Sequence, residues 1–431
     1  MKRLTLLFVI VAAGVLPVGL SHLCEAQTFH SGGVANCDGC HSMHSPTAGG
    51  TFLLVGGTQS ETCLNCHEQA GDTGPTSYHV STATADMVQG TGPRQRTPGG
   101  DFGWLRKTYS WLSGTTTEIE DGSTHGHNII APVNGYNVDP VNTTAPGGTF
   151  TSSQLACISC HDPHAQYRRQ LDGTISRAGA PIWASGSYSG AAVADNEPKS
   201  TGEAVGVYRL LAGAGYTKGT VTFTGNPSAK VPSVYNRTEI STQTRTAYGN
   251  ASTVGHISWG FWCATCHPNM HSSSNYVHPT DEPLGSTVAT TYNQYVKSGD
   301  LTGSVSSSYL SLVPFIEASG DYAVLAGHAK NDNTQLGGPV STDRVSCLSC
   351  HRAHASGFVH MLRFDLGFEF TVINGNYPGI DHPDFASWGI AGPGRARGRT
   401  MVEWQAAYYD RTPGTFATFQ RVLCNKCHAK D

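Results

Sequence analysis

The sequence predicts a chain that is mostly coil with short helices and little regular secondary structure. Its 431 residues include 51 Gly and 22 Pro, which favour turns, whereas only 13% of the residues are charged. A disordered chain is typically more highly charged, so we expect this one to fold. Apart from one cysteine near the N-terminus, all of the 13 cysteines occur in short pairs along the chain. We therefore expect the fold to depend on these pairs more than on long helices or large sheets.

The N-terminus has the pattern of a secretory signal. The basic residues Lys2 and Arg3 precede an apolar run over residues 4–15, and small residues follow. We expect a signal peptide over residues 1–26 and a single exported domain over residues 27–431. An uncleaved membrane anchor is the alternative, but the run is shorter than the roughly 18 residues that a bilayer span needs. No integral membrane span is expected.

The charge pattern argues against one class of partner. The net charge is -4 and no run of Lys and Arg occurs. Proteins that bind nucleic acid typically present a basic patch to the phosphates. Nucleic acid is therefore not an expected partner.

The cysteine pairs all have the form Cys-x-x-Cys followed directly by His. The pairs are Cys37/Cys40, Cys63/Cys66, Cys157/Cys160, Cys263/Cys266, Cys347/Cys350 and Cys424/Cys427, and the histidines after them are His41, His67, His161, His267, His351 and His428. CxxCH is the attachment motif of c-type haem, in which the thiols bond to the porphyrin and the His binds the iron from one face. Two cysteines three positions apart lie on one side of a helical turn, so both sulfur atoms reach the same ring edge.

Zinc ribbons and disulfide frameworks are the alternatives for paired cysteines. Neither predicts a His after every pair. We therefore expect six covalently attached haem c groups, each with its iron. A porphyrin buries more apolar area than an aromatic side chain, so the cofactors should form much of the core. Short helices are expected around the motifs and over residues 401–409.

A second set of histidines is available for the opposite faces of the irons. Three motifs continue as CxxCHxxH and a fourth as CHPNMH, which adds His44, His164, His354 and His271. A His one helical turn after the motif His lies on the same face of the helix, so it cannot reach the far side of its own haem. Each of these residues must serve another haem or none.

The histidines outside the motifs outnumber the six second positions. The candidates are His30, His44, His79, His125, His127, His164, His256, His271, His278, His328, His354, His360 and His382. Met is the rival ligand, but no Met recurs at a fixed offset from the motifs, so we interpret Met as packing. An iron with two histidine ligands has no position for substrate, which favours electron transfer over catalysis.

Longer strings extend beyond the motifs. They are "FHSGGVANCDGCHSMH" (29–44), "CLNCHEQAGDTGPTSYH" (63–79), "TPGGDFGW" (97–104), "GHNI" (126–129), "GHAK" (327–330), "CLSCHRAHASGF" (347–358) and the terminal "CNKCHAKD". Together they closely resemble the OmcS-type hexahaem cytochromes, the extracellular electron-transfer proteins of metal-reducing bacteria that polymerise into conductive filaments. The resemblance covers nearly the whole mature chain and keeps the order of the motifs.

The resemblance implies that all six haems have two histidine ligands and stack into one continuous chain. It implies that His44 crosses the subunit boundary and binds the haem of Cys347, Cys350 and His351 in a neighbouring copy. The other second ligands that it implies come from a set of eight residues: His30, His79, His127, His164, His271, His278, His328 and His354. The remaining candidates, His125, His256, His360 and His382, have no counterparts and are interpreted as solvated or packing residues. The segments around 178–204 and 371–400 diverge from the family and are expected on the outer surface, with residues 392–400 locally basic.

The function that we predict is an electron conduit and not an enzyme. The chain should be exported through the periplasm, polymerise head to tail, and conduct electrons in an extracellular filament at the cell outer surface. Its partners would be further copies of itself, redox partner proteins and extracellular electron acceptors. The alternatives are a soluble monomeric electron shuttle and, less favoured, a multihaem reductase. Histidine ligation without the thioether of Met predicts low reduction potentials.

Overall fold

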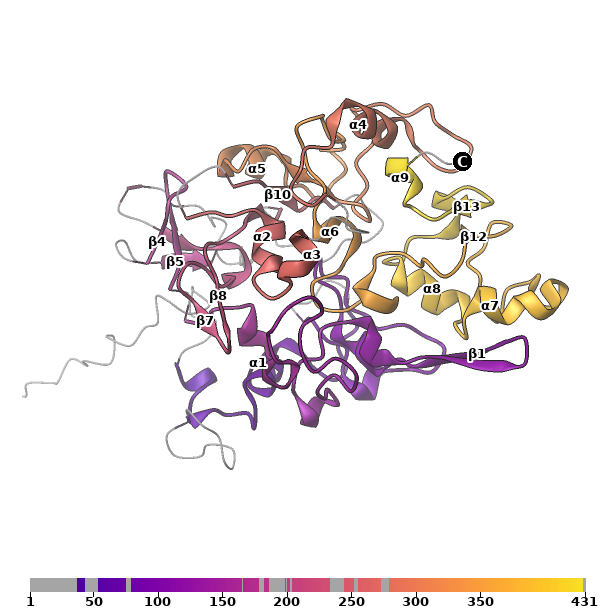
Figure 1. The fold of residues 1–431 in the computed structure, drawn as a ribbon, viewed down its shortest axis with the longest axis horizontal. Coiled ribbons are helices and arrows are strands. Elements are labelled where there is room, and N and C mark those ends of the chain that lie inside the picture. The colour runs from indigo at the N-terminus through magenta and orange to yellow at the C-terminus, as the bar shows by residue number, and fades with distance from the viewer. Residues whose placement is uncertain are drawn as a thin grey trace, which may run out of the picture.

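The computed structural model describes residues 37–42, 53–74, 79–164, 166–177, 182–185, 198, 200–201, 204–232, 244–251, 255–272 and 279–428. Coil connects short helices and small sheets throughout these residues (Figure 1). The predicted fold class, mostly coil with short helices, is confirmed. Within the described residues, no helix combines the length and the apolar character that a membrane crossing requires.

The α-helices are short, and most of them carry or adjoin an attachment motif. They are α1 (Gln59–His67), α2 (Trp259–Ala264), α3 (Pro268–Ser272), α4 (Gly285–Gln294), α5 (Tyr322–His328), α6 (Cys347–Cys350), α7 (Gly392–Ala396), α8 (Met401–Ala407) and α9 (Asn425–His428). The helix expected over residues 401–409 is α8. It begins after Thr400, which forms a capping box with Glu403, and it ends two residues earlier than predicted.

The strands form small separate sheets. The longest pair is an antiparallel hairpin of β1 (Tyr109–Ser113) and β2 (Thr116–Glu120), which projects from the body of the molecule (Figure 1). A four-stranded sheet has the order β4-β3-β6-β5, a three-stranded sheet the order β11-β10-β9, and β7 pairs with β8 and β12 with β13. Their bounds are β3 (Arg168–Gln170), β4 (Ile175–Ser176), β5 (Ile182–Ser185), β6 (Ala204–Gly206), β7 (Thr217–Lys218), β8 (Val221–Thr222), β9 (Ser228–Lys230), β10 (Ala247–Gly249), β11 (Ile316–Glu317), β12 (Phe370–Val372) and β13 (Gln420–Arg421).

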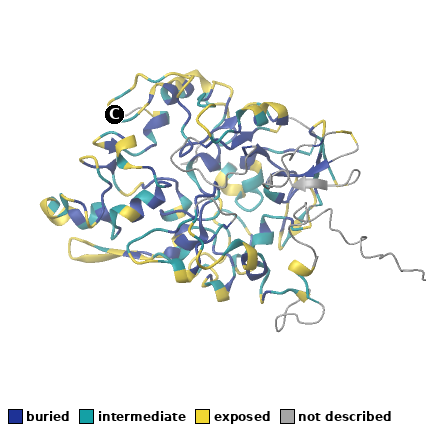
Figure 2. Ribbon diagram, turned by 180° about the vertical axis from the view of Figure 1, so that it is seen from behind, coloured by how far each residue is buried: buried dark blue, intermediate teal, exposed yellow. Residues whose placement is uncertain are grey.

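The largest apolar cluster of the described chain is aromatic and surrounds the last two motifs. Trp404 on α8 and Tyr408 directly after it pack with Trp104, Phe358 and Tyr377, and the cluster also contacts cysteines of both motifs. The rings of Tyr377 and Tyr408 stack at 5.5 Å. Figure 2 shows buried residues distributed through the interior of the molecule and not along one sheet or bundle. Side chains thus supply part of the core that we expected the cofactors to form.

The segment 392–400 is not the outer surface that we expected, because Arg399 is fully buried. Its guanidinium binds Glu120 at the end of β2, and Arg397 reaches the same carboxylate at 3.0 Å. Burial alone would raise the pKa of Glu120, but the hydrogen bond from His125 and the charge of Arg399 hold it at about 2. Arg397 and Arg399 therefore serve to neutralise a buried acid, and that part of the prediction was wrong.

Candidate functional site

The attachment motifs fold as single helical turns. In the third to sixth motifs, the backbone N–H of the motif His donates to the carbonyl of the first Cys, four residues earlier, at 2.8–3.1 Å. The second motif lies wholly within α1. Both cysteines of a pair therefore face one side of the turn, as the spacing predicts.

Hydroxyl side chains start the helices of three motifs. Thr58 caps α1, Ser258 caps α2 and Ser346 caps α6, each accepting a hydrogen bond from a backbone N–H of the first turn. Such caps satisfy donors that have no partner within the helix. They fix the residue at which each of these helices begins.

The first, third and fifth motifs share a further feature, which we call the return turn. After each of these motifs the chain comes back and pairs antiparallel with the motif His, through Leu54, Leu211 and Leu362 respectively. The turn contains non-glycine residues in the left-handed region. They are Leu53 in the first, Arg209 and Leu210 in the second, and His360 and Met361 in the third. Such a conformation costs about 1–3 kcal/mol per residue and is typical of functional sites.

The return turns orient the motif histidines. Nδ1 of His161 donates to the carbonyl of Arg209 at 2.7 Å, and Nδ1 of His351 donates to the carbonyl of His360 at 2.7 Å. A proton fixed on Nδ1 leaves Nε2 as the nitrogen that binds a metal. Sequence reasoning missed both turns because the group that acts is a backbone carbonyl, for which no side chain is a signal.

Three motif histidines face a second histidine. The ring centroids are 6.4 Å apart for His41 and His164, 6.2 Å for His161 and His354, and 6.1 Å for His267 and His127. Two imidazoles that share a metal at about 2 Å from each nitrogen place their ring centres about 6 Å apart. In each pair one member comes from CxxCH and the other from outside it. The spacing fits an iron held between two rings.

The candidate ligands His127 and His354 lie on paired backbone segments. The N–H of His127 donates to the carbonyl of His354 at 2.9 Å. Gly100 has φ +97, and a Cβ there would meet the carbonyl oxygen of Ala355 at 1.8 Å; a Cβ on Gly126 would meet the carbonyl oxygen of His354 at 2.5 Å. The glycines thus permit the close approach of three segments, and one backbone unit holds both candidate ligands.

Several of these imidazoles are held in the neutral form. Burial lowers the pKa of His161 to about 4 and that of His354 to about 3, and burial together with nearby His267 lowers that of His127 to about 4. A histidine must be neutral to bind a metal. At neutral pH these residues are ready to act as ligands.

Thiols of neighbouring motifs also lie together. The thiol of Cys63 in the second motif hydrogen-bonds to Cys157 in the third, and that of Cys263 in the fourth hydrogen-bonds to Cys347 in the fifth. Cys40 of the first motif adds to the raised pKa of Cys63.

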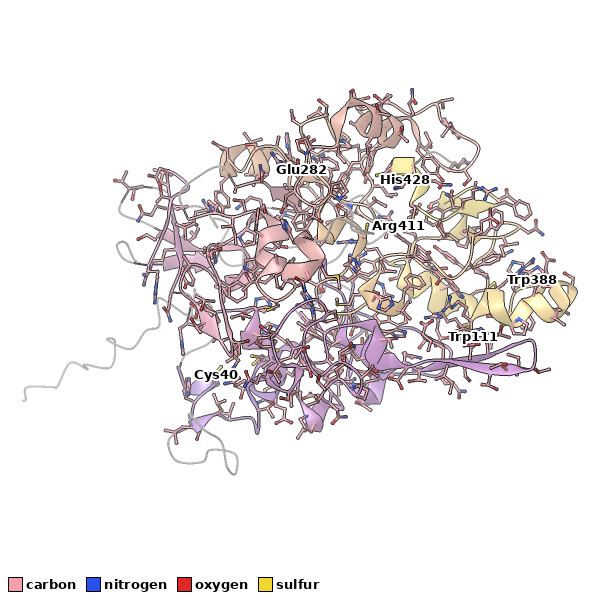
Figure 3. The ribbon with its side chains drawn as sticks, viewed as in Figure 1. Cys40, Trp111, Glu282, Trp388, Arg411 and His428 are labelled. Atoms are coloured by element: carbon pink, nitrogen blue, oxygen red, sulfur yellow. The ribbon has the colours of Figure 1, made fainter. Side chains whose placement is uncertain are left out.

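The third and fourth motifs are also neighbours, as are the fifth and sixth. Burial raises the pKa of Cys160 in the third motif to about 12, and Cys266 in the fourth adds to this effect. Burial likewise raises the pKa of Cys350 in the fifth motif to about 12, with a contribution from Cys424 in the sixth. Motifs that follow one another in sequence are therefore neighbours in space. Cys40 and His428 lie toward opposite sides of the molecule (Figure 3).

Other candidate ligands lie beside carboxylates. Nδ1 of His79 contacts Asp72, and Nδ1 of His328 lies 2.6 Å from Glu317. Nε2 of His271 lies 3.2 Å from Asp281, so this ring faces an acid and not a second imidazole. The candidates His30, His44 and His278 lie outside the described residues.

The histidines without expected partners have structural roles. Both ring nitrogens take part in hydrogen bonds in His125, with Trp104 and Glu120, and the same holds for His256 and His382. The side chain of His360 is exposed, while its carbonyl orients His351. These observations agree with the expectation that the four residues are not ligands.

The alternative uses of paired cysteines find no support in the described residues. None of the cysteine side chains in the described part of the chain forms a disulfide. Over the same residues, His, Cys, Asp and Glu side chains form no group of three or more that would hold a metal ion. The facing histidine pairs instead fit a flat haem between them.

Comparison with known proteins agrees with this geometry. No family profile matches the chain. It is 50% identical over 432 aligned residues, which cover 94% of this chain and 95% of the relative, to the C-type cytochrome OmcS of Geobacter sulfurreducens.

Two solved structures share the fold. The cryo-EM structure of OmcS nanowires from Geobacter sulfurreducens matches with a TM-score of 0.82 and 50% identity, and an outer membrane cytochrome S filament from the same organism with a TM-score of 0.80 and 49% identity. Each match covers 94% of this chain and 100% of the other. A c-type cytochrome carries covalently attached haem. The chain belongs to the OmcS family of c-type cytochromes.

Proposed function

We propose that this protein carries six haem c groups, one on each CxxCH motif, and conducts electrons along a head-to-tail filament of identical copies. The observation that carries the proposal is the set of facing histidine pairs on motifs that are neighbours in space. Haems held in such a series transfer electrons without binding a substrate, because both axial positions of each iron are filled. The proposal includes no enzymatic reaction.

The facing pairs support three assignments of second ligands. His164 completes the site of the first motif, His354 that of the third, and His127 that of the fourth. The second ligands of the second and sixth motifs would come from the set of His30, His79, His271, His278 and His328.

The same pairs support an intersubunit role for His44. His164 follows the third motif and faces the first, and His354 follows the fifth and faces the third. Each such His therefore serves the motif two places earlier. His44 follows the first motif, and no motif precedes the first one in the same copy. In a head-to-tail polymer, the motif two places before it is therefore the fifth motif of another copy. In agreement, no imidazole of the described residues faces His351 of the fifth motif.

The site of action follows from the family and the N-terminus. We place the filament outside the cell, after export through the periplasm directed by the predicted signal over residues 1–26. The relatives are named as nanowires and a filament. Redox partner proteins and extracellular acceptors would exchange electrons with the polymer.

Replacing His44 by Ala tests the proposal. Mass spectrometry should still find six covalent haems, whereas electron micrographs should show single copies or short oligomers in place of long filaments. His360→Asn is the control, because this residue lies outside the ligand set and Asn tolerates its left-handed backbone. Filaments of normal length from the His44→Ala protein would contradict the intersubunit ligand.

Electron paramagnetic resonance of the oxidised protein separates the conduit from a reductase. Irons with two histidine ligands give low-spin signals. A substantial high-spin signal would indicate an open iron and would favour the catalytic alternative.

A further inference from the structure

A lysine occupies the last attachment motif in a way that has no parallel in the other five. Lys426 lies between Cys424 and Cys427, whereas the residues between the cysteines of the other motifs include no Lys or Arg. It is only 3% exposed. A buried lysine is rare unless a specific environment holds its charge.

The environment of Lys426 is polar but neutral. Its Nζ donates to the carbonyl oxygens of Tyr295 at 2.9 Å and Tyr292 at 3.2 Å, and it lies 4.2 Å from the centre of the Tyr292 ring. These carbonyls belong to the C-terminal end of α4, which packs against α9 (Figure 1). The end of a helix carries partial negative charge, and an aromatic face attracts a cation. No carboxylate of the described residues pairs with Nζ. The carbonyl groups and the ring therefore stabilise the positive charge, but no negative charge neutralises it.

The charge lies beside the group to which the haem would be attached. Lys426 directly precedes Cys427 in the sixth motif. The two carbonyl oxygens and the face of the Tyr292 ring favour the protonated form of the amine. A purely structural tie between α9 and α4 would need a hydrogen-bond donor but no charge.

We propose that Lys426 raises the reduction potential of the sixth haem through its buried positive charge. The inference rests on the proposed function, because it requires a haem on Cys424, Cys427 and His428. Reduction adds one electron and converts Fe(III) to Fe(II), which lowers the charge of the iron by one. A fixed positive charge in a poorly solvated site favours that change. An electron that moves along the series of haems therefore occupies the sixth haem for longer than it would without the lysine.

Neutral replacements test the proposal by redox titration of the holoprotein, with dithionite as reductant and absorbance as the readout. In Lys426→Gln and Lys426→Met, one of the six haem steps should move to lower potential while the other five stay in place. Lys426→Arg keeps the charge and should leave all six steps near their original values.

A matched control places the same residue at an equivalent but exposed position. Asn65 also directly precedes the second Cys of its motif, but its side chain is exposed. In Asn65→Lys the new charge is screened by water, so no step should shift by as much as in the neutral variants. A shift of equal size in this control would overturn the requirement for burial.

Two further measurements separate the possible failures. Six covalent haems by mass spectrometry and unchanged titration steps in both neutral variants would overturn the role of Lys426 alone. Fewer than six covalent haems in the unaltered protein would instead overturn the proposed function. Acetic anhydride should acetylate the half-buried Lys297 faster than Lys426, and equal rates would contradict the burial on which the inference depends.

Discussion

The regions around the second motif and around the last two motifs are stabilised in different ways. The second motif lies in α1, which contributes Leu64 to a small apolar cluster with Phe102 and Tyr136. The last two motifs adjoin the large aromatic cluster around Trp404 and Tyr408. We call these the N-terminal and C-terminal haem regions. The C-terminal haem region also contains the buried ion pair between Arg399 and Glu120.

The difference indicates which region depends more on its cofactors. A small cluster buries little apolar surface, and the stability of a domain grows with the surface that it buries. The N-terminal haem region should therefore need its haems in order to fold. The C-terminal haem region has aromatic packing of its own and should retain structure when one haem is absent.

The largest expected effect is the loss of one haem from each region. Cys63→Ala with Cys66→Ala removes the second haem, and hydrogen exchange of the α1 amides should then approach that of exposed loops. Cys424→Ala with Cys427→Ala removes the sixth haem, and the α8 amides should remain protected. Equal loss of protection in the two variants would remove the distinction between the regions.

The buried ion pair of the C-terminal haem region should give the next largest effect. Glu120→Gln leaves the fully buried Arg399 without its charge partner, which should cost about 3–5 kcal/mol in the free energy of unfolding. Glu118→Gln on the same hairpin is the matched control, since this side chain is exposed and should change stability by less than about 0.5 kcal/mol. Denaturant unfolding that gives similar values for both variants would show that the pair contributes little.

The same ion pair predicts an acid-dependent loss of stability. The pKa of Glu120 is lowered from 4.5 to about 2 in the folded chain, so the folded state binds this proton less readily than the unfolded state. The contribution of Glu120 is therefore complete above about pH 5 and declines as the pH falls toward 2. Melting curves between these values should show a weaker pH dependence for Glu120→Gln than for the unaltered protein. An unchanged dependence would assign the acid sensitivity to other groups.

Helix caps should give the smallest effect, and it should be alike in both regions. Thr58→Ala and Ser346→Ala each remove a side-chain cap from a motif helix and should cost about 1 kcal/mol in unfolding free energy. Thr58→Ser keeps the capping oxygen and serves as the control. A much larger cost for Thr58→Ala would show that α1 depends on local interactions as well as on its haem.

The sequence was sufficient to predict features that depend on short spacing. The single helical turns of the motifs, the short helices around them and the helix over residues 401–409 all follow from local patterns. The set of candidate ligands followed from the same kind of reasoning. His164 could be identified as a residue that does not serve its own haem, because that argument needs only the geometry of one turn.

Other features depend on contacts between distant segments. The partner of His164 is His41, and no local pattern specifies that choice. The composition of segment 392–400 is typical of a solvated basic stretch. Arg399 nevertheless binds Glu120, which lies on a hairpin distant in sequence. The return turns act through carbonyl groups, which every residue possesses. In each case the missing information is the tertiary arrangement.

The proposed second ligands would also impose an order on maturation during export. If the N-terminus leaves the membrane first, the first haem site would receive His164 only after the third motif has emerged. The third site would in turn wait for His354, which follows the fifth motif. Each early iron would therefore spend part of its biogenesis with one protein ligand, open to water or small molecules until the later sequence arrives. The first copy at the growing end of a polymer would keep one such iron until the next copy is added.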